Sequence, residues 1–165
     1  MSPDTSASQT STDAGDDLRR LAERIFQLNL MFWALRHKNR TDDPNDLTEP
    51  EFATLDTLVG HGVCTVGTLQ KALNVQPAQM SRIIRSLEAK AGKKMVECQL
   101  NPKDKRRIDV TVTAQGRKAY QDYRELRLDA NMELLASLSK TEQRELIKLL
   151  DRFGALMSER LGGEK

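Results

Sequence analysis

Two segments in which apolar and polar residues alternate, 96–100 and 108–112, constrain the fold of this chain most strongly. Alternation with a period of two is typical of a β-strand that buries one face. Between the two segments lies the loop NPKDKRR, residues 101–107, which begins with a turn-forming Asn-Pro pair and carries four cations. The pattern predicts a β-hairpin with a basic tip, because the strands must bury one face while the tip stays in solvent.

Residues 65–91 predict two helices joined by a tight turn, directly before this hairpin. Thr65 is a suitable N-cap for the first helix, and Pro77 suits the first position of the second, which is predicted to end near Gly92. Two helices followed by a hairpin are the winged form of the helix-turn-helix. The apolar residues of both helices recur at helical spacing and form the predicted core: Val66, Leu69, Leu73, Val75, Met80, Ile83, Ile84 and Leu87.

The opposite face of the second helix lacks bulky apolar side chains and carries two arginines about one turn apart. Amide, hydroxyl and guanidinium groups are the side-chain types that read base edges and phosphates in a major groove. This face and the basic loop therefore predict a double-stranded DNA interface. Its expected residues are Thr65, Gln76, Pro77, Ala78, Gln79, Ser81, Arg82, Arg85, Lys103, Asp104, Lys105, Arg106 and Arg107.

Positive charge is concentrated in the same part of the chain. Residues 76–107 hold nine lysines and arginines against three acids, a net charge of +6 in a chain whose total is +2. Such a block favours a nucleic-acid partner, although on charge alone a solvated surface is an equal alternative. A winged helix used only for protein contact is a further alternative, but its recognition face would expose apolar side chains. Asp104, among four cations, is expected to orient Arg106 through a charge-assisted hydrogen bond.

Long amphipathic helices are predicted on both sides of this module, in a mainly α (α+β) fold. Residues 17–39, capped by Asp17, are apolar over so much of the helix circumference that they need partners on more than one side. A second subunit is the expected partner. We therefore expect residues 17–39 and 114–162 to form a homodimer and residues 48–113 to bind DNA. Residues 1–16 are rich in Ser, Thr, Asp and Gly, which predicts a disordered tail.

Composition and motifs exclude other classes of protein. No apolar run approaches the roughly 20 residues of a membrane span, and the N-terminus lacks the pattern of a signal peptide, so a cytoplasmic protein is expected. Cys64 and Cys98 are too few for a disulfide framework or a four-ligand zinc site. Both are predicted to be core residues, with a redox role as the alternative. Common catalytic motifs are absent, so we expect no enzyme activity, cofactor or metal.

The sequence resembles the MarR family of winged-helix transcriptional regulators. The matching segments are 65–69, 81–84, 87–88, 101–107 and 110–116, and the order of helices agrees from about residue 18 to the end. The most specific part is Asn101-Pro102-x-Asp104-x-Arg106 followed by Thr113-x-x-Gly116. The resemblance implies an obligate homodimer on a palindromic operator, with Arg106 entering the minor groove and Asp104 as its partner. Cys98, Leu100 and the pair Lys93-Lys94 depart from the family pattern.

The resemblance also implies a small-molecule effector in many members of the family, bound between the first and fifth helices and the DNA-binding lobe. An apolar pocket with a few polar tips suits a small aromatic or amphipathic ligand. The alternative is that the same residues fill the dimer core. The expected lining residues are Phe26, Leu30, Trp33, His37, Tyr120 and Tyr123.

Overall fold

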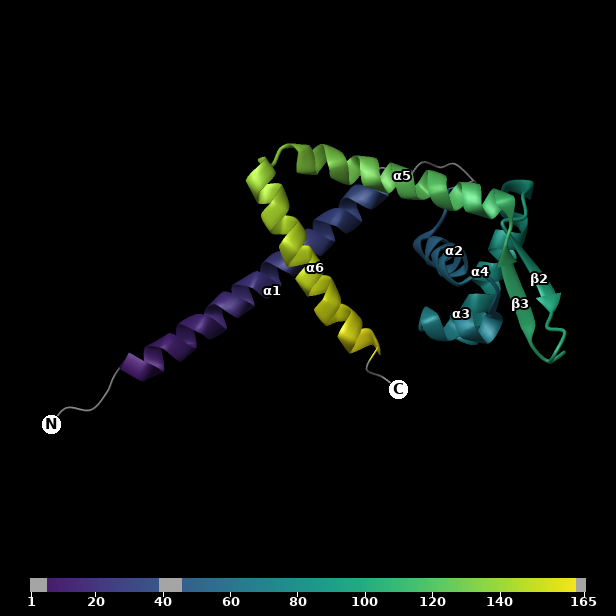
Figure 1. The fold of residues 1–165 in the computed structure, drawn as a ribbon, viewed down its shortest axis with the longest axis horizontal. Coiled ribbons are helices and arrows are strands. Elements are labelled where there is room, and N and C mark those ends of the chain that lie inside the picture. The colour runs from purple at the N-terminus through teal and green to yellow at the C-terminus, as the bar shows by residue number, and fades with distance from the viewer. Residues whose placement is uncertain (1–5, 39–45, 163–165) are drawn as a thin grey trace. The chain divides into compact units, whose positions relative to one another are not determined.

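The computed structural model describes the backbone of residues 6–38 and 46–162 and the side chains of residues 15–35 and 46–160. The chain divides into two compact units, Met1–Asp46 and Leu47–Lys165. The described part of the first unit is one long helix, α1, and the second unit holds all other elements (Figure 1). No helix among the described residues is long and apolar enough to cross a membrane.

Helix α1 spans Ser6–Lys38 and therefore begins well before the predicted cap at Asp17. The prediction that residues 1–16 lack regular structure is wrong for residues 6–16, and residues 1–5 lie outside the described part of the chain. Extending a helix costs far less than nucleating one, so a weak helix-forming segment can be helical when a strong one follows it. Composition alone does not reveal this dependence on the neighbouring segment.

The second unit contains a winged helix followed by two long helices. Helices α2, α3 and α4 gather beside a hairpin of β2 and β3, and α5 leads away from the end of β3 (Figure 1). The elements are α2 (Glu49–His61), β1 (Cys64–Thr65), α3 (Val66–Ala72), α4 (Pro77–Ala89), the 3-10 turn η1 (Lys90–Gly92), β2 (Val96–Leu100), β3 (Ile108–Val112), α5 (Ala114–Ala136) and α6 (Lys140–Gly162).

Local sequence accounts for most of these boundaries. The backbone N–H of Thr48 donates to Glu51 Oε2 at 2.7 Å at the start of α2, and Thr65 Oγ1 accepts from the N–H of Thr68 at the start of α3. The turn between α3 and α4 contains Asn74 at φ 48°, a left-handed conformation that asparagine tolerates better than most residues. A capping box begins α6, where Ser139 and Glu142 exchange hydrogen bonds.

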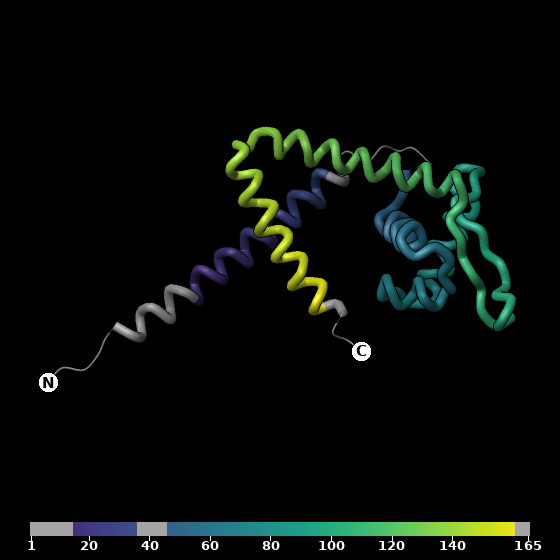
Figure 2. The backbone as a smooth tube through the Cα atoms, in the orientation of Figure 1, coloured from purple at the N-terminus to yellow at the C-terminus, as the bar shows by residue number. Residues whose placement is uncertain are grey.

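The sheet has three strands in the order β1-β3-β2, all antiparallel. In the predicted hairpin, Val96 pairs with Val112 and Leu100 pairs with Ile108. The third strand was not predicted: it consists only of Cys64 and Thr65, which pair with Val110 and Asp109. Figure 2 shows the hairpin extending away from the start of α5, so that loop 101–107 lies at its free end.

A single apolar core joins the three short helices to the sheet and to α5. Of the predicted inward residues, Leu69, Met80, Ile83, Ile84 and Leu87 are buried, and Val66, Leu73 and Val75 are partly buried against them. Val96 and Val110 supply the sheet side of this core. The core therefore fixes α4 against the hairpin, and the opposite face of α4 remains in solvent.

Candidate nucleic-acid interface

The outward face of α4 is exposed over its whole length. Gln76 is its N-cap residue, and Pro77, Ala78, Gln79, Ser81, Arg82 and Arg85 are all exposed. Two of these groups are held along the helix: Ser81 Oγ donates to the Pro77 carbonyl oxygen at 3.0 Å, and Arg85 Nε donates to the Ser81 carbonyl oxygen at 3.2 Å. The hydroxyl oxygen of Ser81 can therefore still accept hydrogen bonds, and the terminal guanidinium nitrogens of Arg85 can still donate them.

The backbone of loop 101–107 is shaped by the Asn101 side chain. Its Oδ1 accepts from the N–H groups of Lys103 and Asp104, each at 2.9 Å, and its Nδ2 donates to the Asp109 carboxylate at 2.9 Å. The Asn101 N–H also donates to the Arg107 carbonyl oxygen at 2.9 Å, which closes the loop. These bonds make the tip a defined turn, although it projects into solvent.

One carboxylate holds both arginines of the loop. Asp104 Oδ1 accepts from the N–H and Nε of Arg106 at 3.1 and 3.2 Å, and Arg107 Nε lies 3.3 Å from Asp104 Oδ2. The backbone and side-chain bonds from Arg106, with the charge of Arg107, lower the pKa of Asp104 below its ordinary value. The Arg106 side chain is 91% exposed and the Asp104 side chain only 30%. Asp104 thus supports two arginine side chains that face outward.

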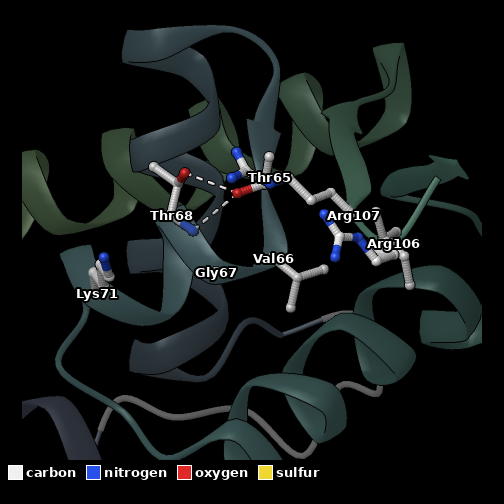
Figure 3. A pocket seen from close by; sticks show the side chains of 8 residues that line it. Thr65, Val66, Gly67, Thr68, Lys71, Arg106 and Arg107 are labelled. Carbon is white, nitrogen blue, oxygen red and sulfur yellow. Dashed lines mark hydrogen bonds between the residues drawn. The ribbon is translucent and has the colours of Figure 1, made fainter. Parts of the chain in front are cut away.

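A hollow of about 600 Å³ lies between the start of α3 and the basic loop. In Figure 3, Arg106 and Arg107 approach it from the loop, and Lys71 lies on its other side. Thr65 and Thr68 share a hydrogen bond of 2.8 Å between their hydroxyl groups. The lining thus combines cations, hydroxyls and apolar side chains: Thr65, Val66, Gly67, Thr68, Lys71, Arg106, Arg107 and Ile108.

Of the residues predicted to contact DNA, Thr65, Arg106 and Arg107 line this hollow, and those of α4 lie exposed on its outward face. Lys103 and Lys105 are exposed in the loop beside the two arginines. Thr68 and Lys71, which line the hollow, were missed, although their spacing after Thr65 on one short helix was available as a signal. Asn101 was also missed as the residue that shapes the loop, because its partner Asp109 lies on the next strand.

The two cysteines do not have the environment of reactive thiols. Cys64 is buried and burial raises its pKa. Burial, together with a hydrogen bond to and the negative charge of Glu88, raises the pKa of Cys98 to about 11. A reactive cysteine needs the opposite shift, because the thiolate is the nucleophile. Among the described residues, no cluster of three His, Cys, Asp or Glu side chains could hold a metal ion.

The predicted effector pocket draws on both units. In the second unit, Tyr120 and Tyr123 stack on Phe52 of α2, with ring centroids 5.2 and 4.6 Å apart. Both hydroxyls are engaged, Tyr120 as donor to Asp56 at 2.8 Å and Tyr123 as acceptor from Arg127 at 2.6 Å. The tyrosines therefore belong to the contact between α2 and α5. Phe26, Leu30 and Trp33 are exposed on α1, and the His37 side chain lies outside the described residues.

Comparison with known proteins agrees with this geometry. Residues 47–108 match the model of the MarR family. An uncharacterised HTH-type transcriptional regulator of Mycobacterium bovis is 29% identical over 133 residues, which cover 80% of this chain and 91% of that protein. A MarR variant from E. coli has a similar fold, with a TM-score of 0.64 and 26% identity, covering 82% of this chain and 95% of that one.

Another similar fold is that of BpsR from Bordetella bronchiseptica, a protein whose DNA binding is regulated by 6-hydroxynicotinic acid. The TM-score is 0.57 at 22% identity, and the match covers 84% of this chain and 98% of BpsR. The basic loop and most of the winged helix lie in the part of the chain that the MarR family model covers. Over residues 47–108 the chain therefore matches the MarR family, and the relatives that match along most of its length are HTH-type transcriptional regulators.

Proposed function

We propose that this protein binds a palindromic operator as a cytoplasmic homodimer, with α4 in the major groove and loop 101–107 in the neighbouring minor groove. The observation that carries the proposal is the arrangement of Arg106. Its guanidinium is 91% exposed at the free end of the hairpin, yet it is held by Asp104. A preorganised arginine at a projecting tip suits a narrow groove of strong negative potential.

The face of α4 supports the major-groove part of the proposal. Gln79, Ser81, Arg82 and Arg85 present donors and acceptors that can pair with base edges, and no bulky apolar side chain interrupts them. Between the start of α3 and the loop, the hollow at Thr65, Thr68 and Lys71 suits a backbone phosphate. Base contacts and phosphate contacts would then come from adjacent elements of one rigid core.

Exposed apolar residues on the long helices support the homodimer. On α6 they recur at helical spacing on one side and include Ile147, Leu149, Leu150, Phe153, Leu156 and Met157. Apolar residues of α1 and of the second half of α5 are exposed in the same way. A single soluble chain rarely leaves apolar surface of this extent uncovered, and a two-fold dimer would cover it with the same faces of a second copy.

A small aromatic or amphipathic effector is a further part of the proposal. It is supported by BpsR, whose DNA binding responds to 6-hydroxynicotinic acid, and by the solved complex of PcaV from Streptomyces coelicolor with its natural ligand. The candidate lining is the set predicted from the sequence: Phe26, Leu30, Trp33, His37, Tyr120 and Tyr123. A ligand there would act on DNA binding through α5, which continues directly from β3.

The proposal is tested by titrating the protein against an operator selected from random duplexes and against a scrambled duplex of equal length. We expect a preference for the operator and a steep loss of affinity with salt, because phosphate contacts release counterions. Arg106→Ala should weaken operator binding by about 1–3 kcal/mol while circular dichroism stays unchanged. Wild-type affinity in this variant would refute the minor-groove role of the loop, and binding without salt dependence would favour a protein partner.

A further inference from the structure

A buried carboxylate connects α2 to the last turn of the DNA-reading helix. Glu51 lies in the first turn of α2, and its side chain is only 4% exposed. Its Oε1 accepts from Ser86 Oγ at 2.6 Å, and its Oε2 accepts from Lys90 Nζ at 2.6 Å. The Thr48 N–H is a third donor, at 2.7 Å to Oε2. Glu51 thus binds α4 and η1 across more than thirty positions of sequence.

The Lys90 side chain is held inside the protein by its ion pair with Glu51. It is one of the nine cations of the basic block 76–107, but its side chain is only 11% exposed. By contrast, Arg82 and Arg85 are exposed on the DNA-facing side of the same helix. Lys90 therefore neutralises a buried carboxylate instead of adding to the cationic surface. A buried pair of this kind contributes little net stability but is costly to break from one side.

The residue next to Glu51 fixes α2 to a different helix. The Phe52 ring stacks with both Tyr120 and Tyr123 of α5. Neighbouring positions on α2 thus hold the DNA-reading helix on one side and α5 on the other. Helix α5 carries part of the proposed dimer interface. Because α2 contacts both α4 and α5, it sets the orientation of α4 relative to that interface. In a dimer on two half-sites, a small rotation of each α4 changes both base contacts and half-site spacing.

We infer that Glu51 is a positioning residue for DNA recognition, which holds Ser86 and Lys90 so that α4 presents Arg82 and Arg85 at the angle that a specific site requires. The inference rests on the proposed function, because it concerns how α4 meets an operator. It assigns no DNA contact to Glu51, which lies inside the protein. The effect must therefore appear as lost discrimination between DNA sequences, in addition to any lost stability.

The test compares affinities of the full-length protein for the selected operator and for the scrambled duplex at fixed salt. Inactive protein lowers both apparent affinities equally, so their ratio reports orientation and not folding. Glu51→Gln removes the buried charge and should lower the ratio roughly 3- to 30-fold. Ser86→Ala removes one of the three donors and should have a smaller effect in the same direction. Glu49→Gln is the matched control, because it removes a charge from the same helix turn at a side chain that is 62% exposed.

A double-variant cycle tests whether Glu51 acts through Lys90. Lys90→Met should lower the ratio as Glu51→Gln does, and the double variant should be no worse than the single ones, because both lose the same contact. Unchanged ratios in Glu51→Gln and Lys90→Met, even with lower thermal stability, would overturn the inference and leave Glu51 a purely structural residue.

A second readout without DNA separates failure of the inference from failure of the proposed function. Amide hydrogen exchange in the last turn of α4, residues 85–89, should be faster in Glu51→Gln than in Glu49→Gln. Equal exchange in the two variants would show that the carboxylate does not hold α4 and would overturn the inference. A wild-type protein that binds operator and scrambled duplex equally would instead overturn the proposed sequence-specific function, whatever the exchange result.

Discussion

Asp104 holds two cations that would otherwise repel each other in loop 101–107. Because the bonds from Arg106 and the charge of Arg107 lower its pKa, the carboxylate stays ionised as pH falls through its ordinary value of 3.8. The contribution of a group whose folded pKa is depressed is present above the unfolded value and is lost only as pH falls through the folded one. The order of the loop should therefore be constant throughout the neutral and mildly acidic range.

Asp104→Ala should act as a weaker form of Arg106→Ala. The arginine stays present but loses its orientation, so we expect a loss of operator affinity that is smaller than the loss in Arg106→Ala. Titration of the operator at fixed salt measures it. Asp122→Ala is the control, because Asp122 also pairs with a cation, Lys118 at 2.8 Å, but does so on α5. A loss as large as that of Arg106→Ala would mean that Asp104 has a role beyond orienting this arginine.

Cys98 should be inert toward oxidants and alkylating agents. With its pKa raised to about 11 by burial and by Glu88, the thiol is protonated at neutral pH, and only a very small fraction is thiolate. Iodoacetamide should modify the native protein far more slowly than the unfolded protein, with a rate that climbs toward pH 11. Operator affinity should not change after treatment with hydrogen peroxide. Rapid native-state labelling of Cys98 would restore the redox alternative.

At the scale of elements, the sequence predicts those helices and strands whose signals lie in neighbouring residues. The N-cap at Thr65, the proline at position 77 and the alternation in 96–100 and 108–112 predicted the winged helix, because each signal lies within a few residues of the structure that it forms. Strand β1 was missed because two residues carry no periodicity and are a strand only through pairing with β3. The contact of Glu51 with Lys90 was missed for the same reason, since no local pattern connects distant positions.

Gly116 shows how a short motif can be explained by packing between elements. Thr113, the N-cap of α5, makes two hydrogen bonds to the segment before β2. Its hydroxyl donates to the Lys94 carbonyl oxygen at 2.7 Å, and its N–H donates to the Met95 carbonyl oxygen at 3.0 Å. A Cβ on Gly116 would lie 2.9 Å from the Met95 carbonyl carbon and from Val112 Cγ2, and closer still to the Met95 oxygen. Backbone atoms cannot move aside as a flexible side chain can. The glycine is therefore required for α5 to approach the sheet.

Gly116→Ala should destabilise the protein by about 1–3 kcal/mol through this overlap. Gly67→Ala is the matched control: Gly67 is also helical, and the nearest atom to its added Cβ is Thr65 Oγ1 at 3.9 Å. There alanine should be neutral or stabilising by roughly 0.5–1 kcal/mol, because it lowers the entropy of the unfolded chain. Urea denaturation of both variants measures the difference. Equal stabilities would contradict the close approach of α5 to the sheet.

At the scale of the whole molecule, charge and apolar surface are separated along the chain. The positive net charge is concentrated between residues 76 and 107, whereas most of the large exposed apolar side chains lie on α1, α5 and α6. A palindromic site offers two identical half-sites, so a chain with one DNA-reading helix needs a second copy to use both. In the proposed homodimer, this separation would let one set of helices hold the two copies together while the winged helix of each stays free for DNA.

Placing a charge in the apolar face of α6 should therefore abolish the dimer and operator binding together. Leu150→Glu would bury an unpaired carboxylate in the proposed interface, and such a charge is costly. Lys148→Glu, an exposed change on the same helix, is the control for charge alone. Sedimentation velocity at micromolar concentration should show a dimer for the wild type and the control, and a monomer for Leu150→Glu. The monomer should still bind duplex DNA weakly through one winged helix but lose its preference for the palindrome. A wild-type chain that sediments as a monomer would refute the homodimer, and the exposed apolar faces would then require a different partner.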